Sequence, residues 1–408
     1  MKSVGLLLAG CLLYSISFSQ KLKAGDYRGV LRREDGIEIP FNFQVSFEHK
    51  KPVIYVINAS EKIKVNTIRQ KSDSLFIEMP LFEARFYLVL KNNGDWQGIF
   101  IKGTRTTDQA IPFYAYYGQS NRYVAAEGKA SISISGRWAV HFIDTATNEY
   151  AVAVFQQSGS YVTGTFLKAT GDYRFLQGVV TGNKLLLSCF DGSHNYAFTA
   201  TVTDSNTLTD GWYYANAVFK QSWKAVRDAH AVLPVLDKPV TLQPGETTLN
   251  FAFRDINGQR VSLNDERFKH KVVVVQLMGS WCPNCMDETN FLSAYYKQNK
   301  ARGVEVVALA YEYSTDFARS QKSLRKFQER FQVTYPMLIT GVAVGDTLRT
   351  EKTLPQLTPI QTFPTTLILD KRGRVRKIHN TFYGPGTGDA FEKFKVAFNR
   401  EIEALLAE

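Results

Sequence analysis

The pattern of apolar residues changes once along this chain, near residue 230, and that change limits the folds available to it. Before this point, apolar and polar residues alternate with period two in short runs that Gly, Asn and Asp interrupt. Such alternation predicts many short antiparallel strands and few helices. Beyond it, short apolar runs alternate with longer segments of helical period, which predicts an α/β layer structure. The chain therefore predicts a multidomain protein, all-β at first and α/β at the end.

The β-rich part is expected to form two modules, residues 20–130 and 131–230. Each could close as a small barrel or pack as a sandwich, and one merged structure is equally compatible with the pattern. Gly136-Arg137-Trp138 resembles the Gly-x-Trp that opens the first strand of lipocalin-like barrels. Ligand binding in this region therefore remains an alternative to a role as scaffold or docking site for partners.

Three prolines interrupt residues 231–245, a stretch of poor periodicity that predicts a linker. The α/β part should then occupy residues 246–408. Its strands are expected at 272–277, 304–310, 366–369 and 375–379, and its helices at 283–300, 317–331 and 389–407.

The net charge of +11 raises the question of a nucleic-acid partner, but the basic residues are evenly spread. Residues 20–232 hold 24 Lys and Arg against 19 Asp and Glu, and residues 233–408 hold the same numbers. Neither half predicts a phosphate-binding surface, so we expect no nucleic acid. The one dense basic run, Lys371 to Lys377, lies where a solvated hairpin is expected.

The first residues have the pattern of a secretory signal peptide, residues 1–19. Lys2 precedes a mostly apolar run from Val4 to Ile16, and Ser17-Phe18-Ser19 offers a small-x-small cleavage site before Gln20. The alternative is a lipoprotein anchor at Cys11, because Leu8-Ala9-Gly10-Cys11 resembles a lipobox, and only in that case is membrane contact expected. Either alternative places the mature protein in the periplasm or an equivalent extracytoplasmic space, where disulfides persist.

Cys282 and Cys285 carry the clearest chemical signal. They directly follow a strand and open a helix, which is the setting that a redox Cys-x-x-Cys pair requires. Residues three apart in a helical turn are about 5 to 6 Å apart, close enough for a reversible disulfide. The helix N-terminus should stabilise a thiolate at Cys282, so Cys282 is the expected attacking sulfur. Cys285, one turn inside, should be more buried and should resolve the mixed disulfide.

Two less specific explanations of the pair remain open, a structural disulfide and half of a zinc site. The zinc site lacks support, because Cys189 and the six histidines show no metal-ligand spacing. Cys189 shares a strand face with Leu185 and Leu187, which predicts a buried, inert thiol rather than a third reactive one.

Three stretches of the α/β part are similar to the TlpA/ResA-like extracytoplasmic thiol-disulfide oxidoreductases, which have a thioredoxin fold. They are Phe251 to Leu263, Trp281 to Cys285, and Thr362 to Asp370. The resemblance implies that Pro364 is cis beside the disulfide and that the backbone of Phe363 pairs with a substrate strand. We accordingly expect Trp281, Pro283, Phe363 and Pro364 to bind substrate.

Glu288 matches an acid that this family places just after the cysteine pair. We predict that it accepts the proton of Cys285 when the mixed disulfide collapses. The alternative is a helix-surface carboxylate that only complements the helix dipole. Thioredoxin itself carries a buried Asp six residues before its first cysteine, and here Gln276 stands at that place and cannot titrate.

The resulting hypothesis is an enzyme that reduces disulfides of exported proteins and is itself reduced by another protein. No NAD or flavin fingerprint is visible, so no cofactor is expected. One alternative is a ligand-binding β-rich protein with an accessory redox domain. The other is a thiol peroxidase, although the chain lacks a Pro-x-x-x-Thr-x-x-Cys segment at the strand end.

Overall fold

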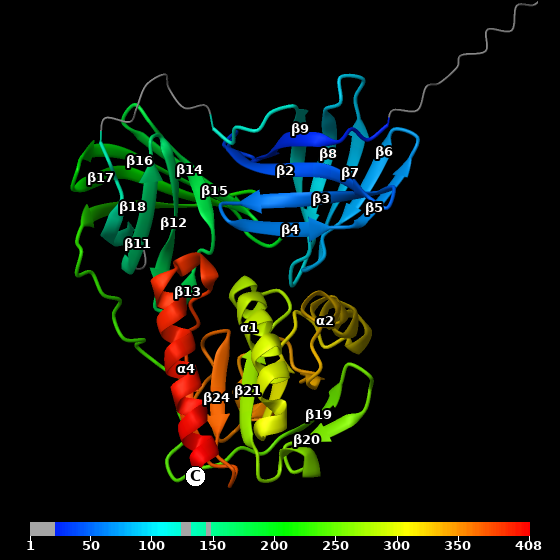
Figure 1. The fold of residues 1–408 in the computed structure, drawn as a ribbon, viewed down its shortest axis with the longest axis vertical. Helices are drawn as coiled ribbons and strands as arrows, with labels where there is room; N and C mark the ends of the chain where they lie inside the picture. Colours follow the sequence, from blue (N-terminus) through cyan, green and yellow to red (C-terminus); the bar gives the residue numbers. More distant parts are fainter. Residues whose placement is uncertain (1–20, 124–131, 144–147) are drawn as a thin grey trace, which may run out of the picture.

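A computed structural model describes residues 21–123, 132–143 and 148–408. The expected signal peptide, the lipobox cysteine and the boundary near residue 130 lie outside the described residues. Two β units lie side by side and an α/β unit lies against both of them (Figure 1). The expected fold class, an all-β N-terminal region followed by a C-terminal α/β unit, is confirmed.

The first unit is one antiparallel sheet of nine strands in the order β4-β3-β2-β1-β9-β8-β7-β6-β5. Alternate side chains of its strands are buried, as the period-two pattern predicted. The strands are β1 Gly25–Arg32, β2 Glu38–Glu48, β3 Lys51–Asn58, β4 Glu61–Val65, β5 Thr67–Lys71, β6 Ser74–Glu78, β7 Ala84–Leu90, β8 Trp96–Lys102 and β9 Gln109–Tyr117.

The second unit closes on itself. Eight of its strands pair in a ring, because β10 bonds to both β11 and β18 and β12 bonds to both β11 and β14. The strands are β10 Gly136–Ile143, β11 Asn148–Ser158, β12 Tyr161–Lys168, β13 Gly171–Asp172, β14 Leu176–Thr181, β15 Lys184–Phe190, β16 Asn195–Asp204, β17 Thr207–Ala215 and β18 Phe219–Arg227. The short β13 adds to β12 outside the ring. A closed antiparallel barrel is one of the forms that the sequence allowed for this module.

Side chains fill the interiors of both β units. Trp138 is fully buried in the second barrel with aromatic neighbours such as Phe166 and Trp223. The first sheet encloses a cavity of about 20 Å³, which has room for about one water molecule. Phe190, at the end of β15, leaves the second barrel and stacks on Phe41 of the first sheet with ring centroids 4.1 Å apart.

The α/β unit is built on a seven-stranded sheet in the order β20-β19-β23-β22-β21-β24-β25, with β21, β22 and β23 parallel. Its strands are β19 Ala252–Asp255, β20 Arg260–Ser262, β21 Val272–Met278, β22 Val304–Ala310, β23 Met337–Ile339, β24 Thr365–Leu369 and β25 Val375–His379. Its helices are α1 Pro283–Asn299, α2 Phe317–Phe331, α3 Arg349–Thr353 and α4 Asp389–Ala407, with 3-10 turns η1 Glu266–Phe268, η2 Lys300–Arg302 and η3 Pro385–Thr387. The predicted strands and helices agree with these bounds to within one residue.

Residues 231–245, the expected linker, form no helix or strand. Their second half nevertheless packs on the α/β unit. Val240 is buried and its N–H donates to the Asn380 side chain, while Leu242 forms an isolated bridge with Leu357. The connection is therefore attached to the α/β unit from about residue 240 onward.

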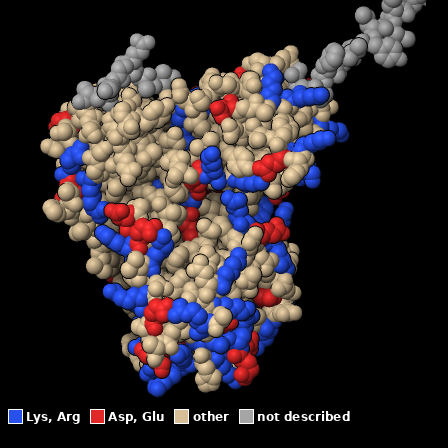
Figure 2. Space-filling model, viewed as in Figure 1, with Lys and Arg blue, Asp and Glu red and all other residues tan. Residues whose placement is uncertain are grey.

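Charged side chains of both signs are interspersed over the face shown in Figure 2, without a large field of one sign. The basic run after Asp370 forms the β24–β25 hairpin, and Asp370 accepts hydrogen bonds from Arg374 and Arg376. Among the described residues, no helix is both long and apolar enough to cross a membrane.

Candidate active site

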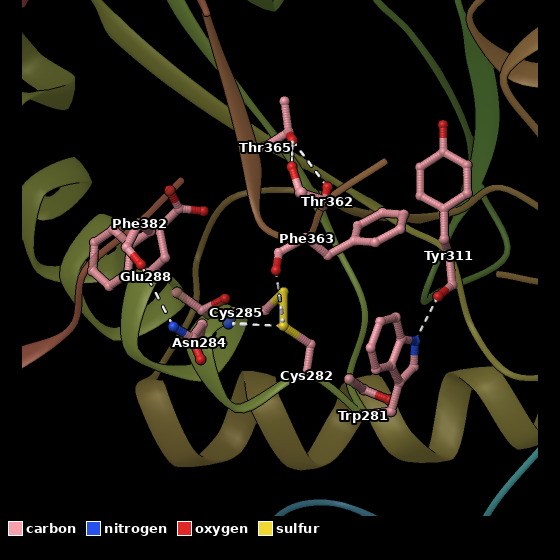
Figure 3. The surroundings of a disulfide bond; sticks show 12 residues. Trp281, Cys282, Asn284, Cys285, Glu288, Tyr311, Thr362, Phe363, Thr365 and Phe382 are labelled. Carbon is pink, nitrogen blue, oxygen red and sulfur yellow. Dashed lines mark hydrogen bonds between the residues drawn. A yellow bond between two sulfur atoms is a disulfide. The ribbon is translucent and has the colours of Figure 1, made fainter. Parts of the chain in front are cut away.

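The cysteine pair lies where a buried strand gives way to a helix. All seven residues of β21 are buried, and four residues separate its end from α1, which has Pro283 at its first helical position. Cys282 is the N-cap of α1, and its Sγ accepts a hydrogen bond from the N–H of Cys285 over 3.2 Å. The two sulfur atoms form a disulfide, with the Cα atoms 5.2 Å apart (Figure 3). After reduction, the N–H of Cys285 and the N-terminus of α1 would stabilise negative charge on the Cys282 sulfur.

The two cysteines differ in exposure as expected. Cys282 is 5% exposed and Cys285 is fully buried. Cys285 is therefore the less accessible of the two cysteines.

The segment around Pro364 faces the disulfide. The Phe363–Pro364 peptide bond is cis, as the resemblance implied. The carbonyl oxygen of Phe363 lies 3.5 Å from Cys282 Sγ, and its ring packs edge-on against Trp281 with centroids 5.7 Å apart. Trp281 Nε1 in turn donates to the carbonyl of Tyr311 over 2.8 Å. Phe363 and Trp281, two of the expected substrate-binding residues, thus lie beside the sulfur pair (Figure 3).

Glu288 is 1% exposed and lies one turn beyond Cys285 in α1, so the alternative of a helix-surface carboxylate is wrong. Its Oε2 accepts from Gln276 Nε2 over 2.9 Å, and its Oε1 accepts from Thr366 Oγ1 over 2.8 Å. Burial raises the pKa of Glu288 to about 7, although both hydrogen bonds lower it. A carboxyl group with this pKa can hold or release a proton near neutral pH.

A second buried carboxylate, Glu312, supports the loop before Cys282. It accepts from the N–H of Ser280 over 2.8 Å and from the Ser280 hydroxyl over 2.5 Å. Burial raises the pKa of Glu312 to about 7 as well. Nothing in the sequence marked this residue, because it follows β22 and meets Ser280 only through the pairing of β22 with β21.

Sequence reasoning also missed the residues that the second barrel contributes around the pair. The Asp172 carboxylate lies 3.3 Å from Nδ2 of Asn284, which stands between the two cysteines in the chain. It also accepts a hydrogen bond from the N–H of Gly384 over 2.8 Å. Arg174 makes two hydrogen bonds, of 2.8 and 2.9 Å, to the carboxylate of Asp287 on α1. These partners are more than 100 residues apart, and no local pattern could have paired them.

Cys189 is a free, fully buried thiol in β15, as predicted, and burial raises its pKa. Within the described part of the chain, no three His, Cys, Asp or Glu side chains are arranged to hold a metal ion.

The model of the AhpC/TSA family matches residues 244–378. The thiol-disulfide oxidoreductase ResA of Bacillus subtilis is 27% identical over 138 residues, which are 34% of this chain and 68% of that protein. The thioredoxin-like protein YneN of the same organism is 27% identical over 142 residues, 35% of this chain and 74% of that protein. The C-terminal part of this chain is an AhpC/TSA thioredoxin-like domain related to the ResA/TlpA thiol-disulfide oxidoreductases. Thiol-disulfide exchange is therefore its activity, and Cys282 and Cys285 are its Cys-x-x-Cys pair.

Solved structures similar to this thioredoxin-like domain include a putative thiol:disulfide interchange protein DsbE from Chlorobium tepidum. The two chains are 22% identical, and the match covers 38% of this chain and 98% of the Chlorobium chain, with a TM-score of 0.29. A DsbF homologue from Corynebacterium diphtheriae shares 23% identity over 40% of this chain and 94% of that chain, with a TM-score of 0.30.

Proposed function

We propose that this protein is an extracytoplasmic reductase of disulfides in exported proteins, working through Cys282 and Cys285. The observation that carries the proposal is the position of Cys282, with its sulfur at the N-terminus of α1 and 3.5 Å from the Phe363 carbonyl. The leader pattern of residues 1–19 supports export. The names of the ResA relatives support the chemistry.

The reaction moves two electrons from the cysteine pair to the substrate. The Cys282 thiolate attacks one sulfur of the substrate disulfide, that disulfide breaks, and the departing substrate thiolate takes a proton. Cys285 then loses its proton and attacks Cys282 Sγ, which releases the second substrate thiol and closes the Cys282–Cys285 disulfide. A protein dithiol must afterwards supply two electrons to reduce the pair again.

Glu288 is the proposed acceptor of the Cys285 proton, directly or through water. It is buried with Cys285 in the first turns of α1, and its pKa of about 7 allows it to take up a proton at neutral pH. Gln276, which holds its carboxylate, cannot take over this role, because an amide does not titrate in this range.

Phe363, Pro364, Trp281 and Pro283 are the proposed contacts for the substrate. Phe363 and Trp281 lie beside Cys282, the more exposed of the two cysteines. In the chain, Pro364 follows Phe363 and Pro283 follows Cys282. An extended substrate segment could pair with the backbone at Phe363 and bring its disulfide to Cys282.

Trapping tests this proposal directly. A Cys285→Ser variant lacks the resolving thiol, so mixed disulfides between Cys282 and exported proteins should accumulate in cells that express it. The matched control is Cys282→Ser, which lacks the attacking thiol. Non-reducing gels and mass spectrometry should find disulfide-linked exported proteins with the first variant alone. Equal yields from the two variants would contradict the proposal.

A further inference from the structure

The redox pair of this protein is covered by its own β region. The tip of α1 that carries the pair points toward the place where the two β units meet (Figure 1). Cys282, Cys285 and Met286 belong to the same hydrophobic cluster as Met79 and Phe82 of the first sheet. Cys282 itself is only 5% exposed.

The second barrel touches the residues on both sides of Cys282. Ser193 Oγ donates to the carbonyl of Trp281 over 3.4 Å. Gly171 lies so close to Asn284 that a Cβ atom at residue 171 would be 2.7 Å from the Asn284 amide nitrogen. The barrel therefore packs directly on the Trp-Cys-Pro-Asn-Cys turn.

One buried guanidinium joins all three units at this place. Arg174 lies 2.6 Å from a carboxylate oxygen of Glu61 in the first sheet and 2.9 Å from one of Asp191 in the second barrel. Its fork binds both carboxylate oxygens of Asp287 in α1. The exposed fraction of the four side chains is 1% for Arg174, 14% for Glu61, 0% for Asp191 and 8% for Asp287.

A second tie lies nearer the surface. Arg319 of α2 pairs with Glu83 of the first sheet at 2.7 Å, and both side chains are about one-third exposed. Lys326 of α2 pairs with Glu78 and reaches the carbonyls of Met79 and Phe82. The covering is thus fastened by charges on both α1 and α2.

Charges make a contact that is selective but reversible. A buried ion pair gives up hydration when it forms and regains it when it opens, so it fixes a geometry more than it adds stability. Arg174 here faces three carboxylates, one from each unit, so this inner contact depends on one cation.

We propose that Arg174, together with the outer Arg319–Glu83 pair, latches the β region over the redox pair, and that a protein partner exchanges with Cys282 only after this latch opens. The β region would then determine which thiols and disulfides react. This inference rests on the proposed function, because it concerns access to the same sulfur.

The test uses the full mature chain in its oxidised form and two latch variants. Asp287→Asn removes the charge on α1 that Arg174 binds. Glu83→Arg places two cations against each other at the outer tie, and the double variant with Arg319→Glu restores an opposite pair there. Glu38→Arg is the matched control, because it makes the same charge change against Arg32 inside the first sheet.

The measurement is the rate at which a reduced protein dithiol, thioredoxin, reduces the Cys282–Cys285 disulfide, read by alkylation and mass spectrometry. Both latch variants should react at least threefold faster than the wild type. The charge-swapped double variant and Glu38→Arg should stay within twofold of the wild type. The proposal would be overturned if the latch variants that fold were reduced less than threefold faster than the wild type. It would also be overturned if the double variant were reduced as fast as Glu83→Arg.

Dithiothreitol in a parallel series separates this outcome from failure of the proposed function. If dithiothreitol reduces the pair while the latch has no effect, the inference about the latch is wrong and the redox function stands. If no variant is reduced by either reagent, the redox function itself is wrong.

Discussion

Gln276 Nε2 on β21 lies 2.9 Å from Glu288 Oε2 on α1, and both side chains are buried. The strand thus holds the carboxylate of the helix with an amide that carries no charge. Only one of the two partners can gain or lose a proton near neutral pH. Proton transfer at Cys285 should therefore follow the titration of Glu288.

The Glu288→Gln variant should lose the pH dependence of the resolving step. In the wild type, the rate at which Cys285 collapses a mixed disulfide should rise with pH through about 7, because the base form of Glu288 is then populated. General-base catalysis is worth about 10²-fold or more, so the variant should be at least tenfold slower at pH 8. Single-turnover kinetics with a preformed mixed disulfide measures this step.

Glu312→Gln is the control for this prediction, because burial raises the pKa of Glu312 to the same value of about 7. Glu312 accepts hydrogen bonds from Ser280, whereas Glu288 accepts from Gln276 and Thr366. Glu312→Gln should leave in place the inflection at about pH 7 in the rate of the resolving step. If Glu312→Gln removed the inflection and Glu288→Gln kept it, the roles assigned here would be reversed.

The free energy of unfolding should fall between about pH 5 and pH 7. The pKa of Glu288 is raised from 4.5 to about 7 in the folded protein, so in this range the unfolded chain has lost a proton that the native state retains. The contribution of Glu288 to the free energy of unfolding is fully present below its pKa in the unfolded chain. It declines as the pH rises through its pKa in the folded protein. Between pH 5 and pH 8, the free energy of unfolding measured with urea should fall by about 2 kcal/mol less in Glu288→Gln than in the wild type. Profiles of wild type and variant that run parallel would contradict the burial assigned to this carboxyl group.

Gly171→Ala should weaken the contact between the second barrel and the disulfide turn. Its φ of 143° disfavours a side chain, and a Cβ atom would meet the Asn284 amide at 2.7 Å. Gly182→Ala is the matched control, since φ there is also positive and nothing lies within 4 Å of the added atom. Gly171→Ala should cost about 1 to 3 kcal/mol more than the control. Faster hydrogen exchange at the start of α1 should accompany it, and equal effects of the two substitutions would contradict the contact.

Phe190→Ala should destabilise the first sheet although Phe190 belongs to the second barrel. The ring is fully buried and stacks on Phe41 of the first sheet. Truncating a buried Phe costs about 3 to 5 kcal/mol. Phe47→Ala is the control, because Phe47 is 46% exposed and should change the unfolding free energy by about 0.5 kcal/mol or less. A similar small effect of both substitutions would show that the two β units are not joined through Phe190.

Sequence reasoning located the redox turn and the elements of the α/β unit because their signals are local. β21 is apolar apart from Gln276, Pro283 starts a helix, and Cys282 and Cys285 are neighbours in one turn. The closure of the second barrel was left open, because it depends on pairing between β10 and β18 across almost the whole unit. The sequence could not show the covering of Cys282, which depends on charges such as Arg174 and Asp287 that lie far apart in the chain. In the sequence, Arg174 stands between Tyr173 and Phe175. An exposed arginine at the edge of a sheet can have the same neighbours, so the sequence did not show that Arg174 is buried.

The central claim is that Cys282 and Cys285 cycle between disulfide and dithiol in the folded protein. Equilibration of the full mature chain with dithiothreitol buffers of graded potential, followed by acid quench, alkylation and mass spectrometry, tests it most directly. The account predicts that the peptides of Cys282 and Cys285 gain alkyl groups as the buffer becomes more reducing, reversibly and with unchanged circular dichroism, while buried Cys189 stays unmodified until denaturant is added. A bridge that opens only when the chain unfolds would contradict it.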